Sequence, residues 1–133
     1  MYNYEIILRE IRPPDSLRTG TDKEYTVEQK VRAGIVGATG YAGVELVRLL
    51  SGHPHVEIAA VSSVSFGGQD FSKIYPGFRG GFREILMEDP KDMPKKCEVV
   101  FASLPHGLSE EMAEACMDGG VLFIDLGADF RCV

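Results

Sequence analysis

Short apolar runs alternate with stretches of helical spacing from Val31 to the end of the chain. Residues 31–36 (VRAGIV) and 56–63 (VEIAAVSS) have the length and branched side chains that are typical of buried strands. Between them, residues 41–51 place most of their apolar side chains on one helical face, and Gly52 offers a left-handed end to that helix. This alternation predicts an α/β fold around a mostly parallel sheet.

The second half of the chain continues the alternation with weaker signals. Residues 64–81 form a long glycine-rich connection, and residues 82–87 (FREILM) predict a weak strand. A further strand begins at Cys97 and leads into a loop at residues 104–107. These features extend the predicted sheet beyond its first two strands.

A second helix and a last strand are predicted near the end of the chain. Ser109 is suited to cap a helix with Glu110 and Glu111 in its first turn, and Gly119 is suited to end it. The following run, residues 121–125 (VLFID), predicts another buried strand.

The first 30 residues differ from the rest because they combine turn formers with charge, as in RPPDSLRTGTDKEY. We therefore expect an N-terminal extension at residues 1–30 and one domain at residues 31–133. The chain has 133 residues, of which 44% are hydrophobic and 26% charged, as in ordinary globular domains.

The charge and the apolar runs exclude several classes of partner. A formal net charge of −6 without a basic patch argues against nucleic acid as a partner. Runs such as VLFIDLGA are too short to span a membrane, and the first residues do not have the composition of a signal or transit peptide. We expect a cytoplasmic protein with reduced thiols, because the three cysteines form no paired or metal-binding pattern.

Three glycines, Gly37, Gly40 and Gly43, stand between the first strand and the first helix. A strand that turns directly into a helix aims unpaired N–H groups at one point, which creates a site for pyrophosphate. Gly40 and Gly43 match the G-x-G-x-x-G spacing, whereas Ala38 replaces the first glycine. The strand before and the helix and strand after are the context that this motif requires, so we predict a Rossmann-like, doubly wound dinucleotide-binding domain.

The end of the second strand indicates which dinucleotide binds. NAD-preferring folds place an acidic residue there, whereas this strand ends with Ser62 and Ser63, and Glu57 lies at the opposite end. We therefore expect NADP. The predicted contacts are Gly37, Thr39, Gly40, Tyr41, Ala42, Gly43, Ser62 and Ser63.

Four segments together resemble N-acetyl-gamma-glutamyl-phosphate reductase: GIVGATGYAGVELVRLL, YPGFRG, VFASLPHGLSEE and FIDLGADFR. The resemblance implies a two-domain, NADP-dependent enzyme of arginine biosynthesis that reduces an acyl phosphate to an aldehyde. It places the loop of Leu104, Pro105 and His106 beside the nicotinamide half of the cofactor. It also implies a homo-oligomer when the second domain is present.

The resemblance places the nucleophilic cysteine beyond Val133, so we expect no catalytic residue in this chain and no turnover by the chain alone. Cys132 lacks the surroundings of that nucleophile. Cys97 begins a strand and Cys116 lies on the inward face of a helix, which is typical of small core residues.

Several alternatives remain open from the sequence. Aspartate-semialdehyde dehydrogenase shares the GATG turn, and a non-enzymatic NADP-sensing module would need the same cofactor site. His53 and His55 lack a third ligand, so we predict no metal site. Asp125, Asp129 and Arg131 cluster at the end of the last strand, where Arg131 fits either the attraction of an anionic substrate or a structural ion pair with an aspartate.

Overall fold

The computed structural model describes residues 30–78, 82, 84–105 and 107–127. Within them a four-stranded parallel sheet has the order β2-β1-β3-β4. The strands are β1 (Val31–Val36), β2 (Val56–Ser62), β3 (Val99–Ala102) and β4 (Leu122–Asp125). The predicted α/β, Rossmann-like class is therefore confirmed. The predicted extension at residues 1–30 falls almost entirely outside the described residues.

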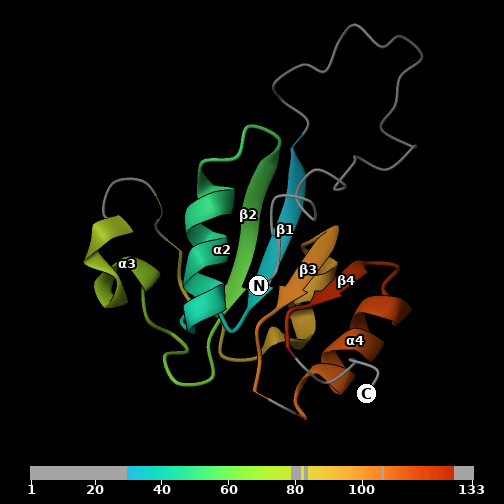
Figure 1. Cartoon of the computed structure of the whole chain (residues 1–133). Coiled ribbons are helices and arrows are strands. Elements are labelled where there is room, and N and C mark those ends of the chain that lie inside the picture. The colour runs from blue at the N-terminus through green and yellow to red at the C-terminus, as the bar shows by residue number, and fades with distance from the viewer. Residues whose placement is uncertain (1–29, 79–81, 83, 106, 128–133) are drawn as a thin grey trace, which may run out of the picture.

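Helices cover both faces of the sheet (Figure 1). Side chains alternate along a strand, so Ile35 and Val36 of β1 point to opposite faces. Ile35 packs in one core cluster with the helix α2 (Tyr41–Ser51), and Val36 packs in a second cluster with the helix α4 (Ser109–Asp118). The 3-10 helix η3 (Pro90–Lys95) contributes its buried Met93 to the second cluster.

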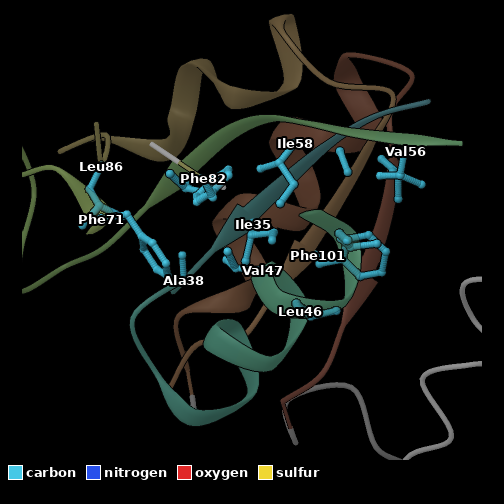
Figure 2. Packing of buried hydrophobic residues seen from close by; sticks show 14 of the residues in the cluster. Ile35, Ala38, Leu46, Val47, Val56, Ile58, Phe71, Phe82, Leu86 and Phe101 are labelled. Carbon is cyan, nitrogen blue, oxygen red and sulfur yellow. The ribbon is translucent and has the colours of Figure 1, made fainter. Parts of the chain in front are cut away.

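The larger cluster surrounds β1 and α2, as Figure 2 shows for Ile35, Leu46 and Val47. These three side chains are at most 1% exposed. Burying each of them fully stabilises the fold by roughly 1.5–3 kcal/mol. The helical spacing that predicted residues 41–51 therefore reflects the face that α2 buries, and both β1 and α2 have their expected bounds.

The glycine-rich connection after β2 is more ordered than expected. It contains the helix α3 (Phe71–Ile74) and the 3-10 helix η2 (Pro76–Phe78). The fully buried ring of Phe71 lies 5.2–5.4 Å from the rings of Tyr75, Phe78 and Phe82. This aromatic cluster fixes the segment against the core.

The expected strand at residues 82–87 is wrong as a continuous element. Its described residues make only two isolated bridges, Asp70 with Ile85 and Ser62 with Met87. The two bridges have opposite directions, so no continuous ladder forms with either neighbour. The Met87 N–H nevertheless donates to the Val61 carbonyl at 2.8 Å, which holds the segment beside β2.

Three local expectations also differ from the structure. Leu108, rather than Ser109, is the N-cap of α4, and the Ser109 hydroxyl donates instead to Asp125 at 3.2 Å. Gly52 ends α2 with φ −96°, outside the left-handed region. The strand β4 is only partly buried, because it lies at the edge of the described sheet and leaves Leu122 57% exposed.

In the described residues no helix combines the length and apolar composition needed to cross a bilayer.

Candidate cofactor-binding site

The loop after β1 lies where the strand order reverses. The chain leaves β1 for β2 on one side and later returns to β3 on the other side of β1. The carboxyl ends of β1 and β3 therefore lead to connections that diverge, which is where open α/β sheets bind ligands. Residues 37–40 and the first turn of α2 occupy this position.

At two positions in the loop and the first turn of α2, contacts within the chain leave no room for any side chain. Gly37 has φ +77°, and a Cβ there would overlap the Ser103 carbonyl at the end of β3. A Cβ on Gly43 would overlap the Gly37 carbonyl and the backbone of Ala38. The contact at Gly43 lets α2 pack closely on the loop that follows β1, which is the packing role of glycine in this type of turn.

Gly40 differs because the protein does not need it to be glycine. Its backbone is extended, with φ −76°, and a Cβ there would meet only the Gly37 carbonyl at 3.6 Å. The space in front of Gly40 is therefore open. This openness fits the second role of glycine in the motif, the close approach of backbone to phosphate.

The first turn of α2 offers unpaired donors beside Gly40. The N–H groups of Gly37 and Ala38 both donate to the Ser62 carbonyl, at 3.1 and 2.9 Å, so they hold the loop. The N–H groups of Tyr41, Ala42 and Gly43 begin the helix and have no intrahelical acceptor. No side chain caps this end of α2 in the described residues, and the helix dipole favours an anion there.

The predicted hydroxyl contacts are tied to one another. Thr39 and Ser63 share a hydrogen bond of 2.7 Å between their hydroxyl groups, and the Ser63 hydroxyl also accepts from the Phe66 N–H at 3.3 Å. The Tyr75 hydroxyl donates to the Thr39 carbonyl at 2.6 Å. These bonds position the loop after β1, and a direct contact of either hydroxyl with a cofactor stays a prediction.

A cavity of about 300 Å³ opens at the carboxyl ends of β1, β2 and β3. Its size is at the lower end of the range for small-molecule sites. Four of its lining residues, Gly37, Ser62, Ser63 and Leu104, are among the cofactor contacts predicted from the sequence. The other lining residues are Val36, Val64, Glu88, Asp89, Pro90, Lys91, Leu108, Glu111 and Met112.

Sequence reasoning missed the part of the cavity wall formed by residues 88–91. The Ser62–Met87 bridge carries this segment past the end of β2, and η3 then begins. Asp89 caps η3 by accepting from the Lys91 N–H at 3.0 Å, and Pro90 is in the first turn. The Asp-Pro pair was the available signal, because both residues favour a helix start.

The other residues predicted from the loop after β3 and the end of β4 do not line the cavity or lie outside the described residues. Pro105 is described but is not among the residues that line the cavity, and His106, Asp129 and Arg131 lie outside the described residues. Asp125 accepts from Ser109 through Oδ1, while its buried Oδ2 has no hydrogen-bond partner.

The two described cysteines belong to the core. Cys97 and Cys116 are buried in the cluster beneath α4. Burial raises the pKa of each thiol to about 11, so both are un-ionised near neutral pH. The prediction that they act as small core residues is confirmed, and Cys132 lies outside the described residues.

His53 and His55 interact with each other rather than forming part of a larger set of ligands. The His55 N–H donates to His53 Nδ1 at 3.1 Å, and burial together with the charge of His55 lowers the pKa of His53. Among the residues that the structure describes, no three His, Cys, Asp or Glu side chains come together as metal ligands would.

Comparisons with known proteins match this geometry. The curated N-acetyl-gamma-glutamyl-phosphate reductase of Clostridium beijerinckii is 52% identical over 76% of this chain, and that of Saccharophagus degradans is 40% identical over the same share. The chain covers 29% of the length of each of these relatives. The resemblance seen in the sequence motifs is thus confirmed.

Solved structures show the same fold at lower identity. Aspartate semialdehyde dehydrogenase from Candida albicans, solved with NADP, has a TM-score of 0.65 and 24% identity, covering 77% of this chain and 31% of that one. The family model for the semialdehyde dehydrogenase NAD binding domain matches residues 32–133. The chain therefore belongs to the semialdehyde dehydrogenase family, whose NAD-binding domain it contains.

Proposed function

We propose that this chain is the NADP(H)-binding portion of an N-acetyl-gamma-glutamyl-phosphate reductase. Such an enzyme reduces N-acetylglutamyl phosphate to N-acetylglutamate semialdehyde and releases phosphate. The observation that carries the proposal is the open space at Gly40, in front of the unpaired N–H groups of α2. The reductase relatives, which are 40–52% identical, support the choice of substrate.

The residues of this chain bind and orient the cofactor. The amides of Tyr41, Ala42 and Gly43 hold the diphosphate, and the Thr39–Ser63 hydrogen bond keeps the loop in the binding geometry. When bound, NADPH supplies the hydride that reduces the acyl group. The part of the cavity beside Ser62 and Ser63 would accept the adenosine ribose, and its apolar residues Leu108 and Met112 would suit a ring of the cofactor.

The nucleophile comes from outside this chain in our proposal. Attack on an acyl phosphate needs a thiolate. Cys97 and Cys116 are buried and stay protonated near neutral pH, so neither meets that need, and Cys132 lacks the sequence surroundings of the family's nucleophile. We therefore expect the 133-residue chain to bind cofactor without turning over substrate.

A titration of the 133-residue chain with NADPH, followed by nucleotide fluorescence, tests cofactor binding. We expect saturable binding that Gly40→Ala weakens by at least about tenfold, because the added methyl group occupies the approach to the amides. Equal binding by the two proteins would contradict the site.

A chimera tests whether this chain can serve as the cofactor-binding portion of a reductase. In it, residues 32–133 of this chain replace the matching region of the Clostridium beijerinckii reductase. We expect phosphate-dependent oxidation of N-acetylglutamate semialdehyde and little activity with aspartate semialdehyde. A folded chimera that binds NADPH but oxidises neither semialdehyde would contradict this role and favour a sensing module.

A further inference from the structure

The segment after Met87 forms a wall beside the end of β2. The Met87 N–H donates to the Val61 carbonyl at 2.8 Å, and Met87 forms a parallel bridge with Ser62. The chain then continues in the strand direction, so residues 88–91 lie beyond the carboxyl end of β2. Glu88, Asp89, Pro90 and Lys91 all line the same cavity as Ser62 and Ser63.

Among the described residues that line this cavity, Lys91 is the one with a basic side chain. Its side chain makes no ion pair with a carboxylate of the described residues, whereas Lys95 on the same 3-10 helix pairs with Asp92 at 2.8 Å. The Lys91 backbone N–H is bonded to Asp89, which fixes where the side chain begins. Lys91 is an exposed residue at the wall of the cavity, and within the described part of the chain no carboxylate pairs with its ammonium group.

Acidic side chains also line this cavity, so a phosphate group bound there would need a nearby cation such as the Lys91 ammonium group. Asp89 caps η3, and the side chain of Glu88 lies against Gly67 and Gly68. Glu111 lines the cavity from the first turn of α4. A phosphate group at the end of β2, with about −1.5 to −2 charges, would face these three carboxylates and needs a cation to balance them.

We propose that Lys91 binds the 2′-phosphate of the adenosine ribose and thereby selects NADP over NAD. The ribose of a bound dinucleotide lies at the end of the second strand in folds of this type. Ser62 and Ser63 provide hydroxyl groups there but no positive charge, and Ser63 already bonds to Thr39. This inference rests on the proposed cofactor-binding function and adds the residue that sets its specificity.

Calorimetric titration of the 133-residue chain with NADP⁺ and with NAD⁺ tests the proposal. We expect Lys91→Ala to weaken NADP⁺ binding by about tenfold or more and to leave NAD⁺ binding within about twofold, because only NADP⁺ carries the phosphate. Lys91→Arg should retain most of the preference. Lys95→Ala is the matched control, because Lys95 is on the same helix and paired with Asp92, and it should change neither affinity.

Two results would overturn the assignment of Lys91. One is unchanged NADP⁺ affinity in a folded Lys91→Ala protein, and the other is an equal loss for both nucleotides. In either case the wild-type chain still binds a dinucleotide, so the proposed function stands. If the wild-type chain binds neither nucleotide, the proposed function itself fails and the role of Lys91 fails with it.

Discussion

The hydroxyl groups of Thr39 and Ser63 lie 2.7 Å apart and share a hydrogen bond. Thr39 belongs to the loop after β1, and Ser63 follows the last residue of β2. The bond therefore joins the loop after β1 to the strand end where the cofactor ribose is proposed to lie. Cofactor binding and loop stability should respond together to changes at this contact.

Replacing Ser63 with alanine removes this bond from a buried site, since Ser63 is only 4% exposed. We expect the free energy of unfolding to fall by about 1–2 kcal/mol, because the Phe66 N–H also loses its acceptor. Urea denaturation measures the change. Ser51→Ala is the control, because that hydroxyl bonds to Arg48 on an exposed helix end, and it should cost less than about 0.5 kcal/mol. Equal effects of the two substitutions would contradict the account.

The hydroxyl of Tyr75 holds the same loop from the aromatic cluster, through a 2.6 Å bond to the Thr39 carbonyl. We expect Tyr75→Phe to lower the free energy of unfolding by about 1 kcal/mol and to weaken NADPH binding, because the ring remains but the loop loses a tether. Thermal unfolding and a nucleotide titration measure the two effects. Tyr41→Phe, at a fully exposed position, should leave the unfolding temperature unchanged.

Alanine at Gly43 should mainly lower the stability of the fold, whereas alanine at Gly40 should mainly weaken nucleotide binding. A methyl group on Gly43 meets the backbone of Gly37 and Ala38, so Gly43→Ala should lower the free energy of unfolding by about 1–3 kcal/mol or more. Gly40→Ala meets only ordinary contacts and should cost less than about 1 kcal/mol, the scale of a weaker N-cap. Nucleotide binding should nevertheless weaken by at least about tenfold in Gly40→Ala. A stable Gly43→Ala protein would show that α2 does not pack this closely.

The buried thiols predict a loss of stability at alkaline pH. Burial raises the pKa of Cys97 and Cys116 to about 11 in the folded chain, against about 9 for an ordinary thiol. Below pH 9 both states bind the thiol protons equally. As pH rises from 9 towards 11 the unfolded chain releases protons that the folded chain retains, so stability falls. Urea unfolding at pH 8, 9 and 10 should show a steeper decline for the wild-type chain than for the Cys97→Ala, Cys116→Ala double variant. Parallel declines would contradict this origin.

The sequence predicted the elements whose signal is local. The strand β1 is a short apolar run buried on both faces, and the helix α2 repeats its buried positions along one face, so both have the expected bounds. The cap predicted at Ser109 was wrong because it depends on a contact with a residue far along the chain. Ser109 bonds to Asp125, 16 positions further along the chain, instead of capping its own helix.

The sequence predicted the packing role of glycine in the turn after β1. A Cβ on Gly43 would overlap the Gly37 carbonyl, as expected for the last glycine of the motif. The cavity wall at residues 88–91 was not predictable, because the single bridge between Ser62 and Met87 places it. A bridge between residues 25 positions apart leaves no periodic signal in the sequence.

Amide chemical shifts recorded by NMR during a titration with NADP⁺ test the central claim most directly. If the first turn of α2 holds the diphosphate, the largest changes will be at the amides of Tyr41, Ala42 and Gly43, and they will be absent in Gly40→Ala. Saturable binding that leaves these three amides unmoved would contradict the account.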